Sequence, residues 1–163
     1  MAILLLSEEY IRQNATGSEV IDYRVYYPHI IACQDLYLDD LIGIDFKNSL
    51  LSKYENQTLN PFEEQLMIYI KQMLLKRVEA STNDFLTYRG RSKGVQTSSG
   101  NDSTTAQRQD VGAIYNLLNE YADKYRDYVC KYIIKNKSEF PLYEGSCSDG
   151  ECEVEFDIYT YGL

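Results

Sequence analysis

Four stretches of this sequence place apolar residues at every third or fourth position, over residues 20–42, 44–54, 61–86 and 105–136. This spacing is the period of an amphipathic helix, which buries one face and leaves the other in water. The connections between the first three stretches are short, which favours neighbouring helices that pack against one another. The sequence therefore predicts an all-α fold, a small bundle of four to five helices.

Local signals mark where the first helices begin and break. Ser7 can cap a short additional helix over residues 8–14, whose first turn carries acidic side chains. Pro28 is expected to kink the first long helix or to restart it one turn in. Gly43 interrupts the apolar pattern and marks a tight corner before the next helix.

The helix predicted over residues 61–86 has the sharpest starting signal. Asn60 is its N-cap, Pro61 occupies the first helical position and Glu63 the third, which together resemble a capping box. The shared periodicity of the long helices predicts the following buried residues: Ile31, Leu50, Ile70, Leu74, Leu118 and Tyr125.

Residues 87–105 interrupt the helical domain, which is predicted over residues 1–138, with a polar and flexible stretch. A connection of this length is usually functional or disordered. We expect a projecting loop, with a short hairpin around residues 90–94, that contacts another subunit or a partner protein. The contact is predicted at four residues: Tyr88, Arg89, Arg91 and Lys93. Its basic side chains suit nucleic acid or the acidic tail of a neighbouring copy, and the second reading is favoured.

The remaining residues, 139–163, form an acidic, extended C-terminal arm. Within it, Val154, Phe156 and Ile158 alternate with acidic residues, which is the pattern of a strand with one buried face. The rest of the chain supplies no partner strand, so we expect residues 151–161 to pair with another chain. The predicted contact residues are Val154, Phe156, Ile158, Tyr159 and Tyr161. The alternative is a frayed tail.

Acidic charge is concentrated in this arm. The chain carries 25 acidic and 16 basic residues, and residues 139–163 contain seven acids without a Lys or Arg. The preceding residues, with 18 acids and 16 bases, are close to neutral. The surface that receives the arm should therefore be basic or rich in backbone donors, and nucleic-acid binding by the whole protein is disfavoured.

Composition also limits where in the cell the protein can be placed. No stretch approaches the roughly 20 apolar residues of a membrane span, and the run at residues 2–6 is too short for a signal-peptide core. We therefore expect synthesis in the cytoplasm, no membrane contact and four free cysteine thiols. Sixteen tyrosines without a tryptophan suit subunit contacts, although low genomic G+C content would give the same bias.

Candidate catalytic and metal-binding residues are few. His29, the single histidine, lacks a local nucleophile or orienting group, so a structural role is predicted. Cys147 and Cys152 could form half of a zinc site, but this is disfavoured because the other ligands would come from separate helices. Those ligands would be Cys33, Cys130 or His29.

An acidic cluster surrounds the Gly43 corner and consists of Asp35, Asp39, Asp40 and Asp45. Paired carboxylates can bind Mg²⁺ or Ca²⁺, but the spacing does not match a calcium loop. A solvated, charged surface is the preferred reading. We therefore predict no catalytic residue, no cofactor and no metal, and expect that the protein is not an enzyme.

Several short sequences occur in a particular order along the chain: Leu6-Ser7-Glu8-Glu9-Tyr10-Ile11, Pro28-His29-Ile30, Ala32-Cys33-Gln34-Asp35-Leu36-Tyr37, Ile42-Gly43 before Phe46, Tyr88 with Ser92-Lys93-Gly94-Val95, the tyrosine-rich last helix, and Phe140-Pro141. This ordered set, over about residues 4–143, resembles the head-to-tail connector, or adaptor, proteins of tailed phages, particularly crAss-like and related phages of Bacteroidetes. The acidic end after Tyr143 departs from that pattern.

The resemblance implies a helical structural protein located in the virion neck, at the head–tail interface. Such proteins form a homo-oligomeric ring, usually of twelve copies, below the portal and continue the DNA channel toward the tail. The implied partners are the portal protein and neighbouring neck or tail ring proteins, and DNA passes without sequence-specific binding. A small helical regulatory or scaffold-binding protein that captures a partner through its C-terminal strand is the alternative. A metal-dependent hydrolase using the acidic cluster is a third.

Overall fold

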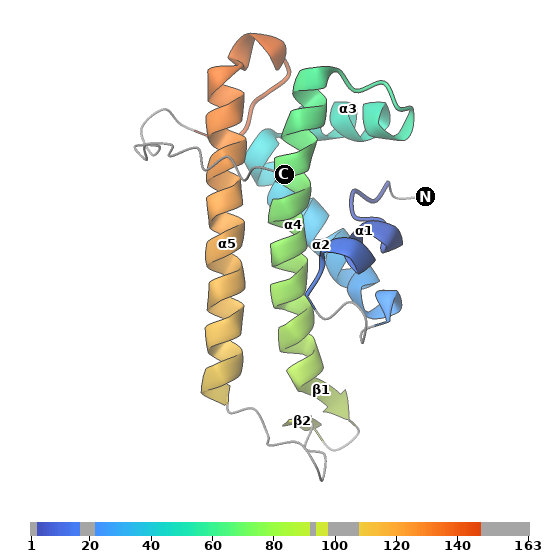
Figure 1. Ribbon diagram of the computed structural model, residues 1–163, viewed down its shortest axis with the longest axis vertical. Helices are drawn as coiled ribbons and strands as arrows, with labels where there is room; N and C mark the ends of the chain where they lie inside the picture. The colour runs from blue at the N-terminus through green and yellow to red at the C-terminus, as the bar shows by residue number, and fades with distance from the viewer. Residues whose placement is uncertain (1–2, 17–21, 92–93, 98–107, 148–163) are drawn as a thin grey trace, which may run out of the picture.

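The computed structural model describes residues 3–16, 22–91, 94–97 and 108–147. This part of the chain contains five α-helices, one β-hairpin and a short 3-10 helix (Figure 1). In chain order these are α1 (Glu8–Asn14), α2 (Tyr23–Ile42), α3 (Ile44–Glu55), α4 (Pro61–Thr87), β1 (Tyr88–Arg91), β2 (Gly94–Thr97), α5 (Arg108–Lys135) and the 3-10 helix η1 (Lys137–Glu139). The predicted helical fold is confirmed, whereas the predicted strand over residues 151–161 lies outside the described ranges.

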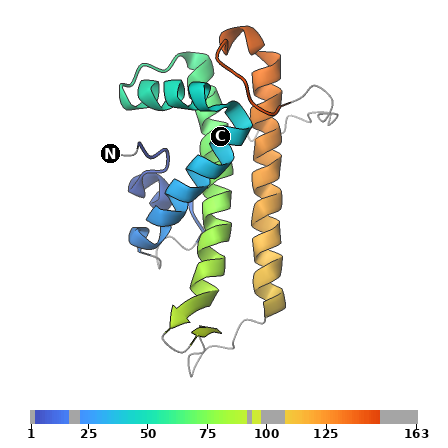
Figure 2. The ribbon, with the colours of Figure 1, turned by 180° about the vertical axis from the view of Figure 1, so that it is seen from behind.

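α4 is the central element of the fold. α5 runs antiparallel beside it, and α1, α2 and α3 lie on its other side (Figure 2). Buried residues therefore occur around most of the α4 surface, including Leu66, Ile70, Leu75 and Val78. A helix that is apolar on several faces has to be covered on several faces, and two layers of neighbours do this here.

The predicted core is largely confirmed. Four of its residues are buried: Leu50, Ile70, Leu74 and Leu118. Ile31 and Tyr125 are only half-buried, so those two assignments were wrong. On α2 the neighbouring Ile30 faces the core instead, and one step along a helix turns the side chain by about 100°.

α2 is continuous through Pro28, so the predicted restart of the helix is wrong. The helix begins after Asp22, whose carboxylate accepts a hydrogen bond of 2.9 Å from the Arg24 N–H. Pro28 lacks the N–H that would bond the Arg24 carbonyl. Both residues are exposed, so water can satisfy that carbonyl and the helix tolerates the proline.

The N-terminal residues are held against α2 by a buried amide. Gln34 accepts a hydrogen bond of 3.0 Å from the Leu5 N–H and donates one of 2.8 Å to the Ile3 carbonyl. Leu5 and Leu6 are buried in the core. The apolar run that begins the sequence therefore supplies core side chains, and the Gln34 amide satisfies backbone groups that this burial removes from water.

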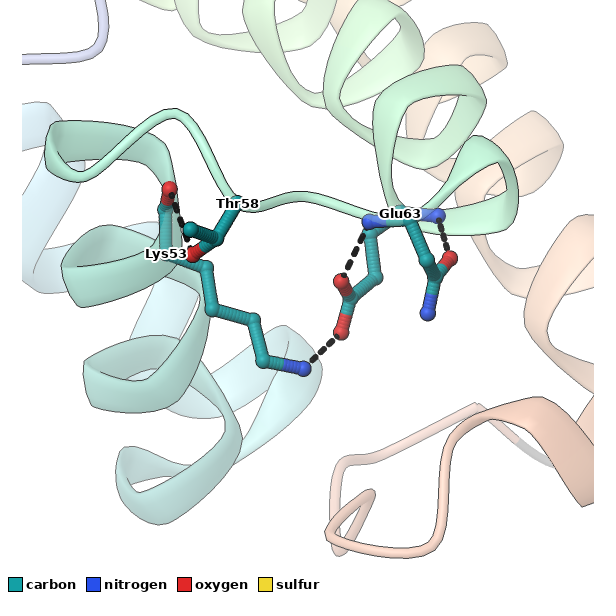
Figure 3. A network of polar contacts seen from close by, with 4 residues as sticks. Lys53, Thr58 and Glu63 are labelled. Atoms are coloured by element: carbon teal, nitrogen blue, oxygen red, sulfur yellow. Dashed lines mark hydrogen bonds and ion pairs between the residues drawn. The ribbon is translucent and has the colours of Figure 1, made fainter.

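The predicted capping box at the start of α4 is confirmed (Figure 3). Asn60 accepts a hydrogen bond of 2.9 Å from the Glu63 N–H, and the Glu63 carboxylate accepts one of 3.0 Å from the Asn60 N–H. The other oxygen of the buried Glu63 carboxylate pairs with Lys53 Nζ at 2.5 Å. One carboxylate thus caps α4 and ties it to the end of α3.

The first part of the predicted arm is packed on the helices. Phe140 is buried, and its ring centroid lies 5.5 Å from that of Phe46. The Tyr143 hydroxyl accepts a hydrogen bond of 2.7 Å from the Cys147 N–H. Gly145 lies so close to α2 that an added Cβ would be 1.9 Å from the Leu41 carbonyl oxygen. The segment between η1 and Cys147 is therefore part of the helical body.

A disulfide between Cys130 and Cys147 fastens this segment to α5. The expectation of four free thiols was therefore wrong for these two residues. The two cysteines are 17 positions apart, and only the chain reversal after α5 brings them together. Cys33 is a free, buried thiol, and its burial raises its pKa to about 11.

We predict that Leu74→Ala lowers the free energy of unfolding by about 2–5 kcal/mol, because it opens a cavity between α4 and its neighbours. Ile68→Ala, a change on the exposed side of the same helix, should cost no more than about 0.5 kcal/mol. Urea denaturation monitored by circular dichroism measures both values. Equal losses at the two positions would contradict the assignment of α4 as the central core helix.

Candidate assembly surface

One flank of α5 presents apolar side chains to solvent. The helix packs on α4 through Leu118, Ala122, Val129 and Ile133, which are buried. Beside that face lies a row of residues that are 38% to 52% exposed: Ile114, Leu117, Tyr121 and Tyr128. We call this row the α5 stripe. Both ribbon views show α5 at the edge of the fold, with α4 on one side (Figures 1 and 2).

The spacing of the α5 stripe shows that α5 has apolar residues beyond the face that contacts α4. Leu117, Tyr121 and Tyr128 lie four and seven positions apart, which puts them on one side of the helix. The apolar arc of α5 is therefore wider than its contact with α4. Exposed aromatic and aliphatic side chains that form a contiguous row are characteristic of protein–protein contacts.

Aromatic contacts hold part of the α5 stripe in place. The ring centroid of Tyr128 lies 6.2 Å from that of Tyr69 on α4 and 5.9 Å from that of Tyr125. Lys124 Nζ lies 5.7 Å from the centroid of the Tyr121 ring. Rings held by such contacts lose little conformational freedom when a partner binds. The tyrosine bias of the sequence thus falls partly on a surface suited to binding.

The predicted hairpin within residues 87–105 is confirmed. β1 and β2 are antiparallel, with Arg89 opposite Gln96 and Gly90 opposite Val95. The hairpin continues directly from α4, at the end remote from α3 (Figure 1). Of the predicted contact residues, Tyr88, Arg89 and Arg91 lie on β1, whereas Lys93 lies outside the described ranges.

The other predicted contact residues are in the arm. They are Val154, Phe156, Ile158, Tyr159 and Tyr161, and all lie outside the part of the chain that the structure describes. The described chain ends at Cys147, which is bonded to the half of α5 remote from the hairpin. The hairpin and Cys147, the last described residue, therefore lie toward opposite ends of the α4–α5 pair.

His29 connects α2 to α4. Its Nδ1 lies 2.7 Å from Ser81 Oγ, and its ring centroid lies 5.5 Å from that of Phe85. Burial lowers the pKa of His29 below its ordinary value of 6.5. Sequence reasoning missed Ser81, which is 52 positions away. The geometry is that of an inter-helix hydrogen bond, in keeping with the structural role predicted for this histidine.

The acidic cluster near Gly43 is partly neutralised by Lys47, which sequence reasoning also missed. Lys47 Nζ contacts Asp39 and lies 3.9 Å from Asp35 Oδ1. Cys147, a candidate zinc ligand, is engaged in the disulfide. Among the described residues, no group of three His, Cys, Asp or Glu side chains is placed to hold a metal ion.

A second set of polar side chains joins α4 to α5 and α2. Arg77 donates hydrogen bonds to Asn119 and Asp123 of α5. Its guanidinium carbon lies 4.7 Å from the centroid of the Tyr37 ring on α2. These contacts fix the register of the antiparallel α4–α5 pair, because Arg77 reaches residues on successive turns of α5.

Residues 38–152 match DUF6712, a family of unknown function. The chain belongs to DUF6712. The matched range begins within α2 and includes the hairpin, α5 and the disulfide, whereas the predicted contact residues of the arm, within residues 154–161, lie beyond it. No curated protein and no solved structure matches the chain. None of the described helices combines the length and apolar character of a membrane span.

We predict that His29 makes stability depend on pH just below neutrality. Because its folded-state pKa is lowered, the unfolded chain binds more protons, so folding is most favourable above the ordinary value of 6.5 and weakens as pH falls toward the lowered pKa. His29→Gln keeps a hydrogen-bonding side chain without this titration and should flatten that part of the profile. Urea denaturation at a series of pH values tests this, and identical profiles for the two proteins would contradict it.

Proposed function

We propose that this chain is a structural virion protein that forms a ring below the portal of a tailed phage. The ring would connect the head to the tail and continue the DNA channel. The observation that carries this proposal is the α5 stripe, a row of exposed apolar side chains on a helix with a single extensive neighbour among the described elements. The sequence resemblance to phage connector proteins indicates which kind of assembly the surface serves.

The positions of the candidate contacts suit a ring. α5, which carries the α5 stripe, lies along one side of the fold, and the hairpin continues from α4 at one end (Figure 1). A contact between two different surfaces of identical copies is heterologous, and such contacts close into a ring when the rotation between copies allows it. Each contact between copies can be weak, because copies already held in a ring are present to one another at a high effective concentration.

The charge of the chain suits passage of DNA. With a net charge of −9, the chain as a whole does not attract phosphates, which suits a channel through which DNA moves without sequence-specific binding. The proposed partners are the portal protein, neighbouring neck or tail ring proteins and other copies of the chain, twelve in all, as the resemblance implies. The proposed location is the virion neck.

We predict that Leu117→Asp combined with Tyr121→Asp prevents ring formation on the portal protein of the same phage. Both substitutions place a charge in the α5 stripe, where a partner would have to desolvate it. Asn116→Asp adds a charge at an exposed position on the same helix but outside the stripe, and should leave assembly unchanged. Electron microscopy and mass photometry of the mixtures measure ring formation and stoichiometry.

The helical circular dichroism signal should be the same for all of these proteins. A wild-type chain that binds a single partner with one-to-one stoichiometry would contradict the connector proposal and favour a regulatory protein. Rings formed equally well by the double variant would show that the α5 stripe lies outside the subunit contacts.

A further inference from the structure

The β1–β2 hairpin is an incomplete sheet. It contains two strands of four residues each, paired from Tyr88 opposite Thr97 to Arg91 opposite Gly94. In an antiparallel ladder only every other residue of a strand bonds to its partner. Because the described residues supply no third strand, both outer edges carry N–H and C=O groups without a ladder partner among them. An isolated two-stranded sheet is marginally stable in water. A third strand along either edge would satisfy backbone groups and enlarge the sheet.

The C-terminal residues have the matching pattern and charge. Val154, Phe156 and Ile158 alternate with Glu153, Glu155 and Asp157, as in a strand with one apolar face. Residues 139–163 carry seven acids and no base, whereas β1 carries Arg89 and Arg91. Opposite charges on neighbouring strands stabilise their pairing, and like charges oppose it.

The disulfide places Cys147, which precedes this segment in the chain, far from the hairpin. Cys147 is fixed to Cys130, with 5.2 Å between their Cα atoms. Arg77 of α4 lies beside the turns of α5 that contain Asn119 and Asp123, because it donates hydrogen bonds to both. At 1.5 Å per residue, the helical path from Cys130 to those turns and on to β1 is about 30 Å long.

The chain after Cys147 is too short to place the whole segment on its own hairpin. An extended chain spans at most about 3.6 Å per residue, so residue 151 lies within about 14 Å of Cys147 and residue 154 within about 25 Å. Residues 151–154 therefore cannot reach a hairpin about 30 Å away. The hairpin of the same chain could therefore pair only with the later residues of the segment, whereas the hairpin of another copy can pair with any part of it.

We infer that residues 151–161 of one copy pair with an outer edge of the β1–β2 hairpin of a neighbouring copy and form a three-stranded sheet. This inference rests on the proposed assembly of identical copies, and it names the receiver of the arm. The mode of binding is β-strand addition, in which backbone hydrogen bonds supply affinity and alternate side chains supply specificity. The arm and the hairpin differ, so the contact is heterologous and can propagate around a ring.

Charge reversal on full-length chains tests the pairing. A hairpin variant carries Arg89→Glu and Arg91→Glu, and an arm variant carries Glu153→Lys and Glu155→Lys. Each alone should associate with itself about tenfold or more weakly than the wild type, because like charges then face each other. Mixed together, they should form heterodimers through the wild-type arm of the first and the wild-type hairpin of the second. A chain with all four substitutions should regain self-association.

Analytical ultracentrifugation gives the masses, and circular dichroism verifies that every variant keeps its helices. Loss of association without recovery in the mixture would overturn pairing between copies, as would unchanged association of both variants. A wild-type chain that is monomeric alone and on the portal protein would overturn it as well. Heterodimers that form no rings on the portal would support the strand pairing and reject the connector proposal. Normal rings from both variants would support the connector proposal and reject the strand pairing.

Discussion

The fold depends on covering α4 from two sides. Its buried residues include Leu66, Ile70, Leu74 and Val78, and neither α5 nor the α1–α3 layer alone could cover all of them. Each such side chain contributes roughly 1.5–3 kcal/mol when it is removed from water, so losing either layer would expose several of them at once. α5 is thus required for the core even though one of its own flanks is exposed. One face of α5 therefore serves the core, while another apolar face stays exposed.

Buried polar groups make this arrangement specific, because each is satisfied by particular partners. The Glu79 carboxylate is buried, accepts a hydrogen bond from the Thr16 N–H and pairs with Lys76 Nζ at 2.7 Å. The Gln34 amide similarly bonds backbone groups of the N-terminal residues. Sliding a helix by one turn would leave these groups buried without partners, which costs about 1–3 kcal/mol for each group. The apolar core alone would tolerate such a slip more easily.

The sequence was sufficient where local signals determine structure. Asn60, Pro61 and Glu63 lie within one turn, so the start of α4 could be predicted from their order, and helical periodicity predicted most of the core. Contacts between distant residues were missed, such as the Cys130–Cys147 disulfide and the bond between His29 and Ser81. No local pattern encodes those pairs, because they depend on how the helices pack and where the chain reverses.

The candidate surfaces also include features that local sequence predicts and features that depend on distant contacts. The hairpin was predictable from the composition of residues 87–105, but its position relative to Cys147, after which the arm continues, was not. That position follows from two long-range contacts. Arg77 fixes the alignment of α4 with α5, and the disulfide fixes the exit of the arm at the opposite end. A shorter α4–α5 pair, or an arm released from Cys130, would let the beginning of the arm also reach the hairpin of its own chain. The separation of the two ends therefore favours contact between copies over closure within one chain.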